Sequence, residues 1–328
     1  MRIAAIVPAF NEEAAIGKVV SDLRLAVPEM VVYVYDNCST DRTAECAREA
    51  GAVVRTENRQ GKGNVVRRAF ADIDADVYLM IDGDDTYDAT AAPRLIDTLL
   101  REQLDHVLGV RVPTAVEGRG GGYRPGHAAG NRFFNRLVTA LFGEPVTDML
   151  SGYRVFSRRF VKSFPALSRR FETETELTVH ARNLRVPQIE VPVGFRDRPP
   201  GSESKLHTVR DGLRILRLIV RLLIHERPAM FFGGLAILLA ALSGGLGIPV
   251  IVEYAHTGLV PRMPTAILAS AIGIIAVLCL WLGVILSGIL RARQEFARLA
   301  YLQWERPPED GATPATAPGA PANGSADS

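Results

Sequence analysis

Short apolar runs alternate with segments of helical spacing in the first third of the chain. The runs typical of buried strands are 2–8 (RIAAIVP), 30–36 (MVVYVYD), 52–56 (AVVRT), 76–82 (DVYLMID) and 105–111 (DHVLGVR). Segments 11–25, 41–50, 61–70 and 90–102 lie between them, and we expect each to form a helix. This alternation predicts an α/β fold with a mostly parallel sheet and helices on both of its faces.

The pattern changes in the C-terminal third, where residues 229–252 and 264–290 contain no charged side chain. Each run exceeds the roughly 20 residues that a helix needs to cross a bilayer. The alternative is a pair of buried helices in a soluble protein, but such helices seldom lack charge over this length. We therefore predict a hairpin of two transmembrane helices within 229–290.

Charged residues divide the remainder of the C-terminal region. Leucines and arginines form separate stripes along 207–228, which predicts an amphipathic helix in the membrane interface, with an ordinary helix packed on the preceding domain as the alternative. Arginines flank both outer ends of the hairpin, whereas the joining loop carries only Arg262, so both ends should be cytoplasmic. We expect a cytosolic domain over 1–206, a juxtamembrane helix over 291–304 and a disordered Pro/Ala/Gly-rich tail over 305–328.

Net charge and cysteine content exclude few classes of function. The net charge of +2 gives no field that would favour nucleic acid. Cys38, Cys46 and Cys279 show neither metal nor disulfide spacing, which suits a reducing compartment. The apolar run at the N-terminus is too short for a signal peptide before it meets Asn11 and Glu12, so we expect this region to stay in the cytosol.

Polar segments follow several of the predicted strands. They begin with PAFNEE, DNCSTD, DGDDTYD and GVR. Because ligands of parallel α/β sheets bind outside the carboxyl ends of the strands, we expect these loops to converge on one site.

The most acidic of these segments is DGDDTYD, in which four aspartates directly follow a buried strand. A calcium loop is excluded because Tyr87 and Pro93 stand where glycine and glutamate are required. A phosphatase with an aspartate nucleophile and a solvated acidic turn are further alternatives. We favour a D-x-D metal site, since alternate residues of an extended segment point the same way. Asp82 and Asp84 would then bind Mg²⁺ or Mn²⁺, which bridges to a diphosphate.

Eight segments in order carry a family resemblance that covers roughly residues 2–206. They are IVPAFNEE, YDNCSTDRT, NRQGKGNVVRRAF, IDGDDTYD, GVR, DMLSGYRVFSRR, FETETEL and IEVPVGFRDRPPGSESKL. The chain resembles glycosyltransferases of family 2 with the GT-A fold. It is most similar to the branch of dolichyl-phosphate mannose/glucose synthases and bacterial polyprenyl-phosphate glycosyltransferases. Val110 and Thr86 depart from the pattern, and Thr86 stands where a glutamine often supplies a third metal ligand.

The resemblance implies roles for single residues. The residues it places around the nucleotide sugar are Pro8, Phe10, Glu12, Asp36 and Lys62. The residues it places at the metal and diphosphate are Asp82 and Asp84, with Asp85 as a helper that orients the sugar or a metal-bound water. The candidates for the lipid phosphate are Arg111, Arg198 and Lys205, with plain surface charge as the alternative.

Three other motif segments leave their roles open. Asp148 and Arg154 bracket SGYR, either for positioning the acceptor or as an internal ion pair. We expect FETETEL to be helical, with Glu176 as its candidate site residue. The glycine-rich segment 116–131 is either a flap over the acceptor or a plain loop.

The resemblance implies inverting, metal-dependent transfer of a hexosyl unit to polyprenyl phosphate at the cytoplasmic face of the plasma membrane. The donor would be a UDP-hexose, UDP-glucose or UDP-GlcNAc. A non-polyprenyl acceptor, a chain-extending polysaccharide synthase and a catalytically silent membrane adaptor are the competing hypotheses. With only two crossings in each chain, association into a homo-oligomer is an open option.

Overall fold

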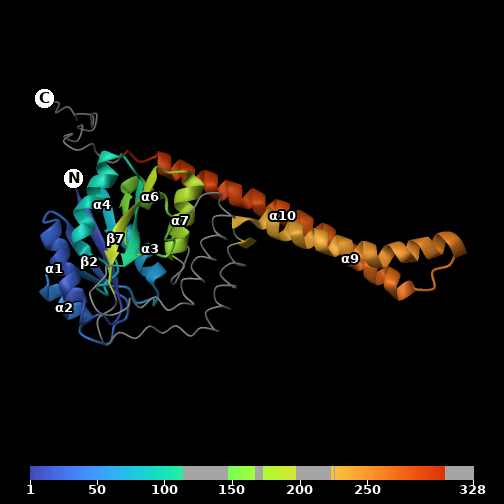
Figure 1. Ribbon diagram of the computed structural model, residues 1–328, viewed down its shortest axis with the longest axis horizontal. Helices are drawn as coiled ribbons and strands as arrows, with labels where there is room; N and C mark the ends of the chain where they lie inside the picture. The colour runs from blue at the N-terminus through green and yellow to red at the C-terminus, as the bar shows by residue number, and fades with distance from the viewer. Residues whose placement is uncertain (114–146, 167–172, 197–222, 225, 307–328) are drawn as a thin grey trace, which may run out of the picture. The chain divides into compact units, whose positions relative to one another are not determined.

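The computed structural model describes residues 1–113, 147–166, 173–196, 223, 224 and 226–306 (Figure 1). The chain divides into two compact units. The sheet unit comprises 1–122, 147–200 and 300–328, and the hairpin unit comprises 123–146 and 201–299. Several predicted features lie outside the described residues: the segment 116–131, Arg198, Lys205, most of the interface helix 207–228 and the tail from 307 onward.

The described part of the sheet unit contains a seven-stranded sheet in the order β3-β2-β1-β4-β6-β5-β7. The strands are β1 (Ile3–Ala9), β2 (Val31–Asp36), β3 (Val53–Thr56), β4 (Val77–Met80), β5 (His106–Pro113), β6 (Arg154–Ser157) and β7 (Gln188–Phe195). Only β6 runs against its neighbours β4 and β5; the other pairings are parallel. The predicted α/β fold with a mostly parallel sheet is therefore confirmed.

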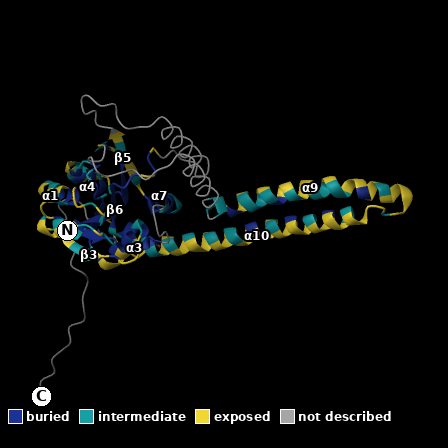
Figure 2. Ribbon diagram, turned by 90° about the horizontal axis from the view of Figure 1, so that it is seen from below, coloured by how far each residue is buried: buried dark blue, intermediate teal, exposed yellow. Residues whose placement is uncertain are grey.

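Helices cover both faces of this sheet (Figure 1). The first layer is α1 (Ile16–Ala26), α2 (Thr43–Glu49) and α4 (Ala92–Arg101), which share a buried cluster with alternate residues of the central strands. The second layer is α3 (Lys62–Asp72), α6 (Arg158–Ser163) and α7 (Thr173–Leu184). There Phe70 of α3 packs edge-on against Tyr78 and Phe156 of the sheet. Figure 2 shows the buried interior that results.

The first helix begins later than its apolar spacing suggests, at Ile16 instead of Asn11. Asn11 has a φ of 55°, which lies outside the right-handed helical region. The backbone N–H groups of Glu12 and Glu13 donate to Thr43 Oγ1, at the start of α2, and to Asp41 Oδ2 of the loop before it. These tertiary hydrogen bonds hold residues 11–15 as a loop beyond β1.

The hairpin unit contains two helices, α9 (Pro228–Thr257) and α10 (Met263–Leu302), each long and apolar enough to cross a membrane. Their surfaces are largely exposed in Figure 2. They pack closely at small residues: Ser243 Oγ donates to the carbonyl oxygen of Ala269 at 2.8 Å. Helix α9 ends where Gly258 adopts a left-handed φ of 69°. Helix α10 continues without a break through most of the expected juxtamembrane segment.

Candidate active site

The loops after β1 and β2 are joined at the carboxyl edge of the sheet. The N–H group of Asn11 donates to Ser39 Oγ at 3.0 Å, and Asn11 Oδ1 accepts from the N–H group of Thr40 at 2.8 Å. Glu12 N–H donates to Thr43 Oγ1 at 2.8 Å. Two of the loops that the sequence predicts to converge are thus held side by side.

The residues predicted to contact the nucleoside line this junction. Pro8 and Ala9 of β1 are in register with Tyr35 and Asp36 of β2. Phe10, next along the chain, is 38% exposed, so its ring is accessible for stacking. Asp36 is largely buried, and its Oδ1 accepts from the N–H group of Ser39 at 3.3 Å. The structure therefore brings Pro8, Phe10 and Asp36 to one edge.

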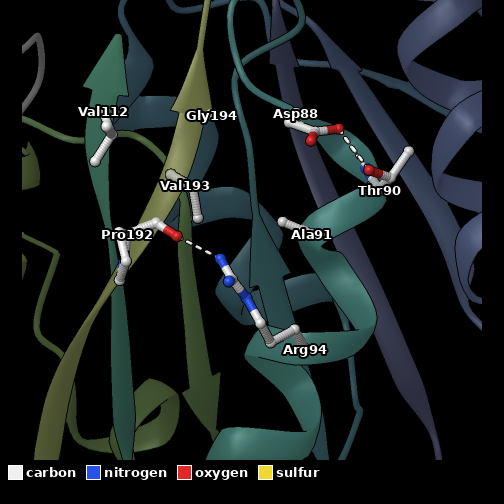
Figure 3. Close-up of a pocket in the computed structure, with 8 residues that line it drawn as sticks. All are labelled: Asp88, Thr90, Ala91, Arg94, Val112, Pro192, Val193 and Gly194. Carbon is white, nitrogen blue, oxygen red and sulfur yellow. Dashed lines mark hydrogen bonds between the residues drawn. The ribbon is translucent and has the colours of Figure 1, made fainter. Parts of the chain in front are cut away.

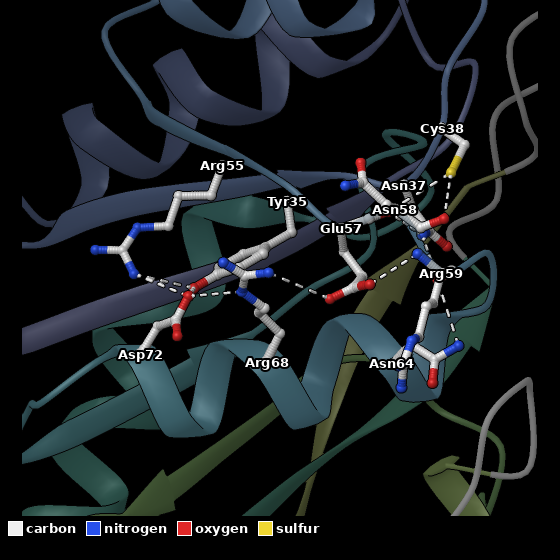
Figure 4. Close-up of polar contacts among 10 residues, drawn as sticks. All are labelled: Tyr35, Asn37, Cys38, Arg55, Glu57, Asn58, Arg59, Asn64, Arg68 and Asp72. Atoms are coloured by element: carbon white, nitrogen blue, oxygen red, sulfur yellow. Dashed lines mark hydrogen bonds and ion pairs between the residues drawn. The ribbon is translucent and has the colours of Figure 1, made fainter.

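Asn37 is a structural residue of this edge that sequence reasoning missed (Figure 4). Its amide nitrogen donates to the carbonyl oxygens of Glu57 and Arg59 at 2.8 and 2.9 Å, and its Oδ1 accepts from the N–H group of Gly61 at 2.6 Å. One buried side chain thereby fixes the whole turn that leads into α3. The only signal was its place directly after Asp36 in YDNCSTD.

The acidic loop after β4 needs its glycine for close packing. A Cβ atom on Gly83 would lie 3.0 Å from Ile16 Cδ1 and 3.3 Å from the carbonyl oxygen of Pro8. Asp84, beyond it, is buried, and its Oδ1 accepts from the Thr86 hydroxyl at 2.6 Å. Thr86, where the sequence departs from the family pattern, therefore holds the carboxylate of Asp84.

The carboxylate of Asp82 lies between the Lys62 ammonium and the backbone of Gly152. Its Oδ1 forms an ion pair with the Lys62 ammonium at the start of α3. A Cβ atom on Gly152 would lie 2.8 Å from Asp82 Cγ, so an alanine at this position would force the carboxylate to move. The Gly152 N–H group is in turn held by the Tyr87 hydroxyl at 2.8 Å. The SGYR motif thus forms a wall of the Asp82 position.

Lys62 also contacts Glu174, in the first turn of α7, with Nζ 2.5 Å from Oε1. FETETEL is helical from residue 173 onward, as expected. Glu174 is a carboxylate of this helix that contacts Lys62, and the site role of Glu176 stays a prediction. Burial alone would lower the pKa of Lys62, yet the charges of Asp82 and Glu174 outweigh it and raise that pKa. Lys62 therefore stays an ammonium at neutral pH.

The other two aspartates of the acidic loop have partners other than Lys62. Asp85 adopts a φ of 55°, rare for a residue with a side chain, and its Oδ1 lies 2.9 Å from Lys18 Nζ of α1. Asp88 accepts from the N–H group of Thr90 at 3.1 Å and caps the short 3₁₀ helix η1 (Ala89–Ala91). Asp85 is thus tied to a helix, and a role in orienting the sugar stays a prediction.

Arg111, a predicted phosphate ligand, is engaged by Asp148. Its Nε and Nη2 donate to the two carboxylate oxygens of Asp148, each at 2.6 Å. The guanidinium also lies 5.4 Å from the ring centroid of Phe195. Asp148 does not form its hydrogen bonds with Arg154, which is fully buried and donates to the carbonyl oxygens of Met149 and Ser151. The internal ion pair of the SGYR segment therefore involves Arg111.

Comparison with known proteins identifies the family. The family model described as "Glycosyl transferase family 2" matches residues 4–164. The chain is 36% identical to "Glycosyltransferase AglJ" of Haloferax volcanii over 77% of this chain and 81% of that protein. The chain belongs to glycosyltransferase family 2. It is also 31% identical to the "Dolichyl-phosphate hexose transferase" of Haloferax volcanii, over 69% of this chain and 95% of that protein.

Solved structures agree on the fold of this family 2 glycosyltransferase. Glucosyl-3-phosphoglycerate synthase from Mycobacterium tuberculosis, in complex with Mn²⁺, UDP-glucose and phosphoglyceric acid, superposes with a TM-score of 0.54 at 24% identity. The match covers 68% of this chain and 78% of that chain. The GT-A fold is thereby confirmed.

The D-x-D carboxylates of the glycosyltransferase suit a divalent cation. Among the described residues, no group of three or more His, Cys, Asp or Glu side chains converges as a metal site. Asp82 and Asp84 nevertheless offer hard oxygen ligands, and Mg²⁺ typically takes one or two carboxylates and completes its shell with phosphate oxygens and water. Asp82 already carries a cationic partner in Lys62, and its side chain is 31% exposed. These residues fit a metal held jointly with a diphosphate.

An open pocket of about 560 Å³ begins at Asp88, the last aspartate of the acidic loop (Figure 3). It is lined by Asp88, Thr90, Ala91, Arg94, Val112, Pro192, Val193 and Gly194. Arg94 donates from its guanidinium to the carbonyl oxygen of Pro192 across it. None of the lining residues is among the predicted site residues.

Proposed function

We propose that this family 2 glycosyltransferase transfers one hexosyl unit from a UDP-sugar, UDP-glucose or UDP-GlcNAc, to polyprenyl phosphate. The observation that carries the proposal is the Asp82–Asp84 pair at the carboxyl edge of the sheet, with Lys62 against Asp82. Such an edge binds phosphorylated ligands in α/β proteins. The two long apolar helices in the same chain favour an acceptor that stays in the membrane.

The names of similar proteins support the two substrates. The relative called a dolichyl-phosphate hexose transferase is matched over almost its whole length. The glucosyl-3-phosphoglycerate synthase with the same fold was solved with Mn²⁺ and UDP-glucose. We extend both to this chain: a polyprenyl phosphate acceptor, and a UDP-hexose donor held with Mg²⁺ or Mn²⁺.

Different residues of the site would bind the nucleoside, the donor diphosphate and the acceptor phosphate. Phe10, Glu12 and Asp36 would hold the nucleoside, and Pro8 would shape its pocket. Lys62 would contact the donor diphosphate. Arg111, with Arg198 and Lys205, would bind the acceptor phosphate; guanidinium groups suit this because they bind phosphate with two hydrogen bonds. Asp148 would orient Arg111 for that contact, since it already holds the guanidinium through two hydrogen bonds.

The reaction needs no strong general base, because the acceptor phosphate is already an anion. One of its oxygens attacks the anomeric carbon, the bond from that carbon to the diphosphate oxygen breaks, and the electron pair leaves with UDP. A single displacement of this kind inverts the anomeric carbon. The protein contributes mainly by positioning both phosphates and by electrostatic stabilisation. A divalent cation, when bound at Asp82 and Asp84, would neutralise charge on the leaving diphosphate.

We also propose that the catalytic unit lies at the cytoplasmic face of the membrane. Nucleotide sugars are charged and water-soluble, whereas the acceptor's hydrocarbon chain remains in the lipid. The arginines that flank the hairpin favour cytoplasmic ends.

Transfer can be tested directly with protein purified in detergent. A panel of UDP- and GDP-sugars would be incubated with undecaprenyl phosphate and Mn²⁺ or Mg²⁺, and products identified by mass spectrometry. We expect a lipid carrying one hexose or N-acetylhexosamine, which disappears with EDTA and in Asp84→Asn but persists in the control Asp97→Asn, an exposed change on α4. If no glycolipid forms with any of the donors, and Asp84→Asn leaves UDP binding unchanged, the proposal is overturned. Transfer only to a water-soluble acceptor would establish the alternative of a non-polyprenyl substrate.

A further inference from the structure

Lys62, Asp82 and Glu174 form a buried row of charges. The Lys62 side chain is 10% exposed and that of Glu174 only 7% exposed, whereas Asp82, at 31%, is the member that reaches solvent. Lys62 starts α3 and Glu174 lies in the first turn of α7, so the second helix layer brings them together. The row therefore has an inner end at Glu174 and an outer end at the predicted donor site.

One ammonium between two carboxylates leaves a net negative charge. Moreover, Glu174 Oε2 is buried and has no hydrogen-bond partner among the described residues. A buried carboxylate is costly unless it is fully paired, so stability alone does not account for this glutamate. Glu174 Oε1 contacts Lys62 Nζ, so we look for the role of this glutamate in its effect on Lys62.

Binding of a cation at Asp82 would change this balance. Asp82 would then take its positive charge from the metal, and Lys62 would no longer be needed there. An ammonium has three N–H donors, so Lys62 can keep one on Glu174 while it turns another toward a phosphate oxygen. A lysine without Glu174 would lose this anchor and would remain bound to Asp82.

We propose that Glu174 is a positioning residue that acts through Lys62. It shares the ammonium with Asp82 before the donor binds and keeps it beside the diphosphate afterwards. Lys62 thus occupies the place of a cation beside Asp82 and would give it up when metal and nucleotide bind together. This inference rests on the proposed function only in that the donor is a nucleoside diphosphate sugar.

The first test is binding of Mn²⁺ alone to the full-length protein, followed through the electron paramagnetic resonance signal of free Mn²⁺. Because Lys62 competes for Asp82, Lys62→Met should bind Mn²⁺ about tenfold more tightly than the unchanged protein. Glu174→Gln should bind Mn²⁺ several-fold more weakly, because in this variant Asp82 is the one carboxylate of the pair that still binds Lys62, and the lysine then competes more strongly with the metal. Equal affinities in all three proteins would overturn the competition between Lys62 and the metal.

The second test is a double-mutant cycle on UDP binding at saturating Mn²⁺, measured by calorimetry. Glu174→Gln and Lys62→Met should each weaken UDP binding about tenfold, and the double variant should bind no more weakly than Lys62→Met, because residues that act as one unit are not additive. Glu174→Asp should recover part of the affinity. Glu49→Gln, an exposed change on α2, is the matched control. A Glu174→Gln effect that persists fully in the Lys62→Met background would contradict the proposal.

Kinetics separate this role from general loss of structure. Glu174→Gln should raise the KM for the donor while the KM for the acceptor stays unchanged. These outcomes are distinguishable from failure of the proposed function. If the unchanged protein binds UDP and Mn²⁺ with the predicted cycle but makes no glycolipid, then the acceptor assignment is wrong and the role of Glu174 stands.

Discussion

Tyr301 donates a hydrogen bond from its hydroxyl group to Asp105 Oδ2 at 2.8 Å, although 196 positions separate the two residues. Asp105 is fully buried and also accepts from Ser157 Oγ and Arg159 Nη2, each at 2.6 Å. Arg159 in addition lies 4.7 Å from the ring centroid of Tyr301. The end of α10 is therefore built into the sheet unit, so the chain after the hairpin returns to the domain that precedes it.

Removal of this hydrogen bond should destabilise the sheet unit. Tyr301→Phe keeps the ring but deprives a buried carboxylate of one donor, and a hydrogen bond to a charged group contributes about 1.5–3 kcal/mol. We expect a lower unfolding temperature in detergent, by about 2–4 °C for each kcal/mol lost. Tyr254→Phe, at an exposed position in α9, should change nothing. Identical unfolding of Tyr301→Phe and the unchanged protein would show that the contact contributes no stability.

The return of the chain also predicts membrane topology. Asp105 precedes α9 and Tyr301 lies in the last turn of α10, so their contact requires both ends of the hairpin to lie on one side of the membrane. Cysteines introduced as Leu259→Cys and Gln303→Cys, in a background with Cys38, Cys46 and Cys279 replaced by serine, should react with an impermeant maleimide from opposite sides. In inside-out vesicles we expect only Gln303→Cys to be labelled. Labelling of both positions from one side would exclude the hairpin topology.

Gly152 should be essential for activity because of its distance to Asp82. In Gly152→Ala the new Cβ atom would lie 2.8 Å from Asp82 Cγ, closer than real contacts allow. The carboxylate must move, and a displacement of about 1 Å at a catalytic group can reduce the rate about a hundredfold. We expect kcat/KM to fall by about that factor in the glycolipid assay. Gly17→Ala is the control, since its Cβ atom would meet only the carbonyl oxygen of Cys46 at 3.9 Å. Full activity of Gly152→Ala would refute the close approach.

The sequence was sufficient for β1 to β5, for the two long apolar helices and for the acidic edge, because each depends on local apolar spacing or on a short motif. It did not predict β6 and β7, which complete the seven-stranded sheet. It was not sufficient for partners that meet across the fold. Asn37 holds the turn before α3 through contacts with three residues of another loop, and no spacing rule reports such a contact. The choice between Glu174 and Glu176 depended on which face of α7 meets α3. The start of α1 was wrong because tertiary hydrogen bonds, rather than apolar periodicity, decide where that helix begins.

His106, next to Asp105, should make stability depend on pH. Its ring is fully buried and stacks on Phe156 with centroids 5.1 Å apart, and Nδ1 lies 3.0 Å from Gln188 Oε1. Burial, with the nearby charge of Arg154, lowers the pKa of His106 from 6.5 to about 3. Above pH 6.5 the imidazole is neutral in the folded and the unfolded chain, so it contributes no pH dependence there.

Below that pH the two states differ. His106 becomes protonated in the unfolded chain but stays neutral in the folded chain. The free energy of unfolding therefore decreases as the pH falls from about 6.5 toward about 3, by at most about 1.4 kcal/mol per pH unit. We expect a lower unfolding temperature at pH 5.5 than at pH 7.5. His106→Leu removes the titrating group, so its unfolding temperature should change less between the two pH values, whatever its absolute stability. An equal pH dependence in both proteins would mean that other groups, such as buried His180 with its pKa lowered to about 4, carry the whole effect.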